Sequence, residues 1–85
     1  MSLMPAQSRA ARGWLNWTQA DLAQRASVGL STLKDFESGK RTPIANNVSA
    51  LRRALEEGGA SAFLVATDSI APDAGTDAGA TGPDA

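Results

Sequence analysis

Residues 18–40 read TQADLAQRASVGLSTLKDFESGK, and the first half of this stretch has the pattern of a short helix. Leu22 and Ala26 fall four residues apart and give the segment one apolar side. Thr18 precedes them at a position where a hydroxyl caps a helix by accepting a hydrogen bond from a backbone N–H one turn on. Asp21 adds a negative charge in the first turn, which suits the positive end of a helix. This half therefore predicts a helix that begins just after Thr18.

The second half of the stretch predicts another helix, from about residue 30 to residue 38, after a break at Ser27-Val28-Gly29. Leu33 and Phe36, three residues apart, point to one side of it. Gly39 follows where a glycine in the left-handed conformation commonly ends a helix. The other faces of the helix carry Ser31, Thr32, Lys34, Asp35 and Ser38. An apolar inner side and a short, polar outer side are what a helix needs to lie in the major groove of a duplex.

The pattern T-Q-x-x-L-A-x-x-A-x-V-x-x-x-T-L-x-x-F-E-x-G-K-x-x-P, over residues 18–43, resembles the Cro/C1 (Xre-type) helix-turn-helix family. The resemblance extends over roughly residues 5–63. Two positions depart from it, because the family often has the turn glycine where Ser27 stands and a Ser or Thr cap where Gly29 stands. The resemblance implies an all-α, lambda-repressor-like bundle of four to five short helices that binds double-stranded DNA.

Two further helices are predicted on either side of this pair. The first covers residues 5–15, with Pro5 at a first helical position and Asn16 suited to the left-handed conformation that ends a helix. The other covers about residues 45–57 and ends at Gly58-Gly59, with Arg52 and Arg53 beside its apolar stripe. The inward residues are expected to be Ser8, Ala11 and Leu15 in the first helix and Val48, Leu51 and Leu55 in the other.

The two tryptophans are expected to pack rather than to stack on bases. Trp17 is expected to be a wedge between the first two helices. Trp14 is expected either to be half-exposed or to line a dimer contact.

The C-terminal third divides into an apolar segment and a tail. Residues 60–66, ASAFLVA, predict a short strand or an extended segment laid over the core. This segment is a candidate dimer contact, and simple coverage of the core by Phe63 is the alternative. Beyond it, Ala, Gly, Asp, Thr and Pro dominate, and such a composition buries too little apolar surface to repay ordering. The expected layout is a leader over residues 1–4, a DNA-binding domain over residues 5–65 and a disordered acidic tail over residues 66–85.

Charge is divided unevenly along the 85 residues. All eight Lys and Arg residues precede residue 54, and four of the nine acidic residues lie in the tail. The body therefore carries a formal charge of +3 and the tail −4. A weakly basic body permits DNA binding without requiring it. The acidic balance of the whole chain is not an argument against DNA binding.

The amino-acid composition argues against several classes of function. The chain has no Cys and no His, and so lacks a disulfide framework, the usual zinc ligands and the commonest general base. We expect no cofactor, no metal, no small-molecule ligand and no enzymatic activity. No apolar run is long enough to span a membrane, and a cytoplasmic location is expected.

By the resemblance, the helix over residues 30–38 reads bases, and neighbouring residues hold phosphates. Leu30 suits a thymine methyl group, and Asp35 suits a cytosine amino group. The helix has no Arg, Asn or Gln for a bidentate purine contact, so readout per base is expected to be modest. The expected base-contacting residues are Leu30, Ser31, Thr32, Lys34 and Asp35. The expected phosphate-contacting residues are Gln19, Arg9, Lys40, Arg41, Thr42, Asn46 and Asn47. Gln19 is also expected to brace the reading helix.

The resemblance further pairs Arg12 with Glu37 in a partly buried ion pair that fixes the first helix against the reading helix. Glu37 is then a scaffold residue rather than a catalytic acid. The function expected is a sequence-specific transcriptional regulator, a repressor by preference, acting as a homodimer on two half-sites. The alternative is a protein-interaction module of the same fold, an antitoxin or a docking unit of a regulator, with weak or no DNA binding.

Overall fold

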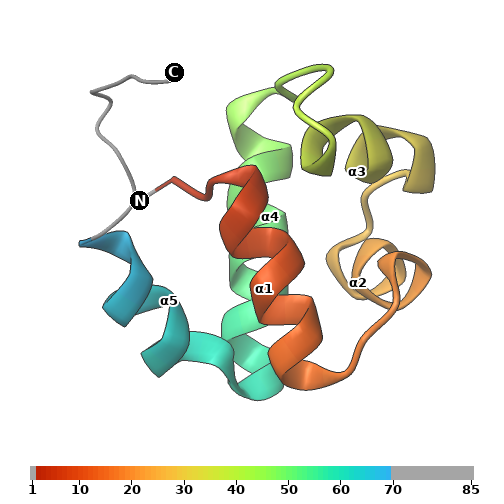
Figure 1. The fold of residues 1–85 in the computed structure, drawn as a ribbon. Coiled ribbons are helices and arrows are strands. Elements are labelled where there is room, and N and C mark those ends of the chain that lie inside the picture. The colour runs from red at the N-terminus through yellow and green to blue at the C-terminus, as the bar shows by residue number, and fades with distance from the viewer. Residues whose placement is uncertain (1, 70–85) are drawn as a thin grey trace.

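A computed structural model of the chain describes residues 2–69, and within them five α-helices and one short π-helical turn follow one another (Figure 1). In chain order these elements are α1 (Pro5–Leu15), α2 (Gln19–Ala26), α3 (Leu30–Glu37), α4 (Ala45–Leu55), the π-helical turn η1 (Glu56–Ala60) and α5 (Ser61–Asp68). The described region is therefore an all-α bundle, as the sequence predicts. None of its helices has the length and apolar composition needed to cross a membrane.

Capping residues fix the limits of the first two helices. The Thr18 hydroxyl accepts from the Asp21 N–H at 3.0 Å, and the Asp21 carboxylate accepts from the Thr18 N–H at 2.9 Å. Hydrogen bonding to the carboxylate, first from the Thr18 backbone N–H and then from the Thr18 side chain, holds the pKa of Asp21 below its ordinary value. Asn16 ends α1 at φ 61° and Ser27 ends α2 at φ 56°, both in the left-handed region. Ser27 thus adopts the left-handed conformation for which the family often has a glycine at this position.

Gly39 ends α3 as the sequence predicts. Its φ is 81°, its N–H donates to the Phe36 carbonyl at 3.0 Å, and the Lys40 N–H donates to the Asp35 carbonyl at 2.9 Å. These two bonds form the Schellman arrangement, which satisfies carbonyls that a helix end would otherwise leave unpaired. The chain then turns sharply away toward α4.

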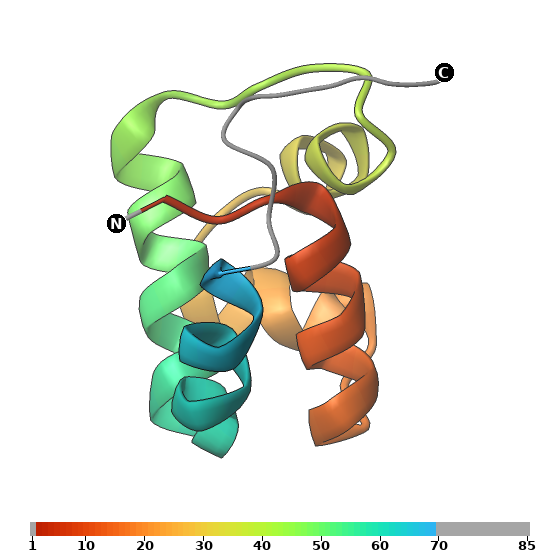
Figure 2. The same cartoon turned by 60° about the vertical axis from the view of Figure 1, so that its left-hand side comes forward.

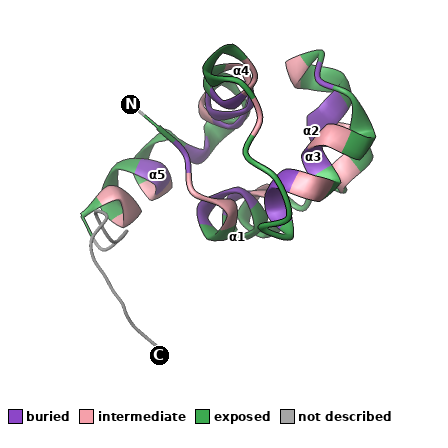
Figure 3. Ribbon diagram, turned by 90° about the horizontal axis from the view of Figure 1, so that it is seen from above, coloured by how far each residue is buried: buried purple, intermediate pink, exposed green. Residues whose placement is uncertain are grey.

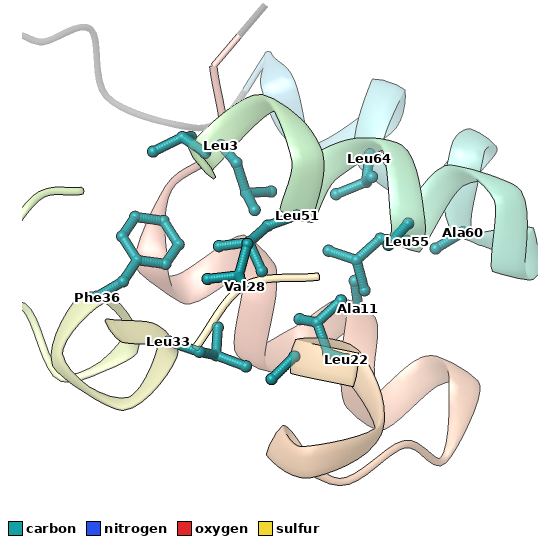
Figure 4. Packing of buried hydrophobic residues seen from close by; sticks show 13 residues of the cluster. Leu3, Ala11, Leu22, Val28, Leu33, Phe36, Leu51, Leu55, Ala60 and Leu64 are labelled. Carbon is teal, nitrogen blue, oxygen red and sulfur yellow. The ribbon is translucent and has the colours of Figure 1, made fainter. Parts of the chain in front are cut away.

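One apolar core joins all five helices (Figure 4). Five leucines from four different helices are almost completely buried in it: Leu22, Leu33, Leu51, Leu55 and Leu64. Phe36 and Val28 close the side next to α3, and Ala11 lies against the core from α1. The buried residues face inward on every helix (Figure 3).

The helices lie on two sides of a central pair. α1 and α4 form the middle of the molecule, α2 and α3 lie on one side of it, and α5 lies on the other (Figures 1 and 2). The side that carries α3 is therefore separated from α5 by the thickness of the bundle.

The prediction for residues 60–66 was wrong, because the segment is helical. Ser61–Asp68 forms α5, and its one fully buried side chain is Leu64. The run of Ala, Phe, Leu and Val gave no clear helical stripe, since Val65 remains 63% exposed while Leu64 beside it has no exposed surface. A helix that buries one large side chain has too weak a periodicity to be distinguished from a strand.

Parts of the expected leader and of the expected tail contribute to the described fold. Leu3, placed in the expected leader, is 3% exposed and belongs to the core. Residues 66–68, placed in the expected tail, are the last turn of α5. The rest of that tail, residues 70–85, lies outside the described residues.

A buried arginine holds α5 in place. Arg52 was expected beside the apolar stripe, but it is 5% exposed. Its guanidinium donates to the Asp68 carboxylate at 2.8 Å, to the Glu56 carboxylate at 3.0 Å and to the Ser2 carbonyl at 2.8 Å. Gln7 of α1 also donates to Asp68, at 2.8 Å. The bonds from Arg52 and then from Gln7 keep the pKa of Asp68 below its ordinary value.

The passage from α4 to α5 requires glycine at two adjacent positions. α4 is α-helical to Leu55, two residues short of the predicted end, and the π-helical turn follows it. Gly59 lies at φ 116°, a conformation that side chains rarely adopt. A Cβ on Gly58 would overlap the Trp17 ring and lie 3.2 Å from Leu15 Cδ1. Trp17 is half-buried and packs against Gly58, and the Arg25 guanidinium of α2 lies 4.3 Å from its ring centroid, whereas the sequence predicted a wedge between α1 and α2.

We expect Gly58→Ala to lower the free energy of unfolding by about 1–3 kcal/mol, because the added methyl group must displace a packed ring. Chemical denaturation measures the change. Gly13→Ala is the matched control, since nothing lies within 4 Å of a Cβ at this position in α1. The control should gain about 0.5–1 kcal/mol from helix propensity. Equal effects from the two substitutions would contradict the packing role of Gly58.

Candidate nucleic-acid interface

α3 is anchored on one side and open on the other. Leu33, Phe36 and Glu37 are buried against the rest of the bundle. Among the residues expected to contact bases, Leu30, Ser31 and Lys34 are exposed, whereas Thr32 and Asp35 are half-buried. The helix thus presents a short polar surface with one apolar side chain, Leu30, at its beginning.

The segment after α3 continues this surface. Lys40, Arg41 and Thr42 are exposed in the loop that leads to α4. Asn46 is exposed and Asn47 is half-buried in the first turn of α4, where no side chain caps the helix. Neither α3 nor α4 has an acidic residue in its first turn. Free backbone N–H groups without a nearby carboxylate favour an anion.

One anion interrupts this otherwise neutral and basic surface. The Asp35 carboxylate lies 4.0 Å from Arg41 Nε, and the Arg41 side chain is 75% exposed. An exposed pair at this distance contributes at most about 1 kcal/mol. Arg41 is therefore free to leave Asp35 for a stronger anion, and Asp35 then remains on the surface as a hydrogen-bond acceptor.

Gln19 and Arg9 approach α3 at its C-terminal end. Gln19 Nε2 donates to the Glu37 carboxylate at 3.0 Å, which is the bracing contact expected from the sequence. A primary amide has two N–H donors and a carbonyl, so this bond leaves polar atoms available to a ligand. Arg9 donates to the Glu37 backbone carbonyl. A cation at this end of a helix stabilises the helix dipole.

The Glu37 carboxylate is the centre of the hydrogen bonds that hold α3. Arg12 donates to its two oxygens, at 2.7 Å from Nη2 to Oε1 and 2.9 Å from Nε to Oε2. The Ser8 hydroxyl donates to Oε2 at 2.6 Å, and Gln19 completes the set. The ion pair between Arg12 and Glu37 is the one predicted from the sequence, and its side chains are 18% and 2% exposed.

Burial and hydrogen bonding act on the pKa of Glu37 in opposite directions. Burial is the largest effect and raises this pKa, because it penalises the charged form. The bonds from Arg12, Ser8 and Gln19 together outweigh burial, so that the pKa lies below its ordinary value of 4.5. Glu37 is thus held as a carboxylate, which fits a structural role and not that of a proton donor.

Sequence reasoning missed Ser8 and Gln7 as partners in polar networks. Ser8 was expected on the inward face, but its bond to Glu37 has no signature in the sequence because the residues are distant in the chain. Gln7 had a recognisable signal. It is the third residue of a helix that begins at Pro5. Its side-chain oxygen Oε1 accepts from the Met4 N–H at 2.9 Å, as a capping-box glutamine does.

We expect Glu37→Ala to lower the free energy of unfolding by about 3–5 kcal/mol, because it leaves the largely buried Arg12 guanidinium without its partner. Thermal and chemical denaturation measure this loss. Glu57→Ala, which removes an exposed glutamate of the π-helical turn, should change stability by no more than about 0.5 kcal/mol. A normal melting temperature for Glu37→Ala together with altered sequence preference in DNA binding would contradict the scaffold role.

The lowered pKa of Glu37 also predicts the effect of acid. Its stabilising effect is fully present above the ordinary value of 4.5 and is lost as the pH falls through the lower folded value. In Glu37→Gln, the free energy of unfolding should therefore fall less steeply with pH below about 4.5 than in the parent chain. Denaturant titrations at a series of acidic pH values measure both slopes. Identical slopes would exclude a linkage through Glu37.

A comparison with models of known families identifies the family of this chain. The model of the family described as helix-turn-helix matches residues 9–58, which run from within α1 through α4 and make up more than half of the chain. The comparison with curated proteins found no match. The matched range contains the capped α2, the exposed face of α3, the basic loop, and Glu37 with its partners Arg12 and Gln19. The chain belongs to the Cro/C1-type helix-turn-helix family of DNA-binding domains, a family of DNA-binding modules and not of enzymes.

Proposed function

We propose that this chain is a cytoplasmic, sequence-specific transcriptional regulator, a repressor by preference, that inserts α3 into the major groove of duplex DNA. The observation that carries the proposal is the division of α3 into two sides. Leu33, Phe36 and Glu37 anchor the helix, and Ser31 and Lys34 stand in solvent. A helix held rigidly by one side and open on the other can enter a groove without rearrangement of the bundle.

The chemistry of the outer side suits a modest readout of bases. Leu30 is 39% exposed and can contact a thymine methyl group. Asp35 can accept from a cytosine amino group but cannot approach a phosphate without repulsion. Ser31, Thr32 and Lys34 add donors that either base type can use. Because α3 has no residue for a bidentate purine contact, backbone contacts and duplex shape supply the remaining specificity.

The proposed phosphate contacts come from the loop after α3, the first turn of α4 and two residues that contact Glu37 at the end of α3. Lys40, Arg41 and Thr42 are exposed directly after the helix, and Asn46 and Asn47 open α4 with uncapped backbone N–H groups. Gln19 of α2 and Arg9 of α1 each donate one hydrogen bond to Glu37, and both side chains have further N–H donors that could bind a phosphate. Two copies on half-sites about 34 Å apart would combine the small contribution of each set.

A protein-interaction module is the second candidate, and the charge of α3 favours it. Asp35 places an anion in the middle of the proposed reading surface, and the body carries a formal charge of only +3. An antitoxin or docking unit would use the same exposed side of α3 against a protein. Phosphate contact is the property that separates the two candidates.

We expect binding to duplex DNA to weaken steeply with salt, because each phosphate contact releases counterions. Lys40→Ala should reduce the slope of log affinity against log salt by about 1. Arg53→Ala removes an exposed cation of α4 outside the proposed contacts and is the matched control, with an unchanged slope. Fluorescence anisotropy over about 50–200 mM salt measures these slopes. Binding too weak to detect at the lowest salt would favour the interaction module.

A further inference from the structure

An open hollow lies between the N-terminal segment and the start of α4. Its volume is about 370 Å³, and most of its surface is apolar although it opens to solvent. The residues that line it are Ser2, Thr42, Pro43, Ala45, Val48 and Ser49. The proposed base contacts of α3 do not use this hollow. It is therefore a concave site open to a further apolar side chain.

The hollow is close to the point where the described part of the chain ends. Arg52 Nη1 donates to the Ser2 carbonyl at 2.8 Å and to the Asp68 carboxylate at 3.0 Å, so these two acceptor oxygens lie at most about 6 Å apart. Figure 2 shows the end of α5 next to the N-terminal segment, below the start of α4. The chain thus leaves α5 beside a residue that lines the hollow.

The first large apolar residue after α5 is near enough to reach the hollow. Ile70 follows Asp68 by two residues, and two residues of extended chain span about 7 Å. It is also the only large apolar residue of residues 70–85. Pro43 and Val48 offer it an apolar contact in the hollow. Ile70 is therefore the one apolar anchor that this segment contains.

The charges beyond the hollow are complementary to those that follow Ile70. Lys40 and Arg41 directly precede the lining residue Thr42, and both are exposed. Residues 70–85 have no Lys or Arg, and they contain Asp73, Asp77 and Asp84. Asp73 lies three residues after Ile70, a separation of about 10 Å in extended chain. An isoleucine seated in the hollow therefore brings carboxylates within reach of the two cations.

We infer that residues 70–77 dock along the start of α4 of the same chain, with Ile70 in the hollow and Asp73 and Asp77 against Lys40 and Arg41. Because these two cations are proposed phosphate contacts, the docked segment competes with a duplex, and this last step rests on the proposed function. The contact does not require a folded tail. A short tether gives an effective concentration of about 1 mM, so that an intrinsic dissociation constant of about 0.2 mM occupies the site in most molecules.

Docking lowers the affinity for duplex DNA without changing sequence preference. The apparent dissociation constant rises by the inverse of the fraction of molecules whose phosphate-binding surface is open, which is about fivefold at the values above. Salt screens the contact between the aspartates and the cations, so the effect is largest at low salt. The outer side of α3 stays uncovered, because Ser31 and Lys34 are not part of the hollow.

The first test needs no DNA. The chain has no Cys, so Ala78→Cys provides a single site for a nitroxide, which broadens the NMR signals of nearby backbone amides. In the full chain, the amides of Lys40 and Arg41 should be strongly broadened. Ile70→Ser in the same labelled chain should reduce this broadening several-fold. Val65→Ser is the matched control, since it removes a 63% exposed apolar side chain of α5 that does not line the hollow, and it should leave the broadening unchanged.

Three results of this measurement overturn the inference. Broadening at Lys40 and Arg41 that is no stronger than in α2 excludes the contact. Equal broadening in the parent and in Ile70→Ser excludes docking through the hollow. The third result comes from a mixture of nitroxide-bearing chains with isotope-labelled chains that lack the nitroxide. Broadening of the same amides in that mixture would mean that the segment comes from a second copy.

The second test compares affinities for a duplex selected by the parent chain from a random pool. At about 50 mM salt, Asp73→Asn and Ile70→Ser should each bind about two- to fivefold more tightly than the parent, and the gain should shrink toward about 200 mM. Asp84→Asn removes the same charge outside the docked residues and should bind as the parent does. Equal gains from Asp73→Asn and Asp84→Asn overturn the inference, because net charge alone then explains them. If no variant binds a duplex, the proposed function fails while the nitroxide measurement still decides whether the segment docks.

Discussion

The carboxylate of Glu37 belongs to α3, yet the side chains that donate to it come from other helices. Arg12 and Ser8 reach it from α1, and Gln19 reaches it from α2. A buried charge is tolerated only when such partners satisfy it, because burial alone opposes ionisation. The same bonds fix the position of α3 along and around its own axis, which apolar packing by Leu33 and Phe36 leaves less well defined. The orientation of the exposed side of α3 therefore depends on this one group.

The two sides of the bundle differ in how their helices are held and in the surface that they expose. On the α3 side, short polar side chains and uncapped helix ends stay available to a ligand, and the interior supplies rigidity through a polar network. On the α5 side, a single buried leucine and the Arg52–Asp68 pair hold a helix whose remaining surface is apolar. Such a helix adds little to the core.

Much of the α3 side can be inferred from local rules. Thr18 and Asp21 identify the start of α2, and Gly39 identifies the end of α3, since each acts on a backbone group within four residues. The pairing of Arg12 with Glu37 came from the family pattern and not from any local rule. Ser8, Arg52 and the helical state of residues 61–68 were missed or misjudged because each depends on partners distant in the chain. A lone serine or arginine gives no sign of which carboxylate it will meet.

The bonds of Arg52 have a consequence for both ends of the described region. One guanidinium holds the carbonyl of Ser2 and the carboxylate of Asp68, so the N-terminal segment and the last turn of α5 share a single anchor. A shortened chain that started at Met4 would empty the core position of Leu3 and also weaken the attachment of α5. Any domain fused to the N-terminal segment would leave the bundle near the end of α5, remote from α3 (Figure 1). Such a fusion would leave the exposed side of α3 unobstructed and would crowd the opposite flank of the bundle.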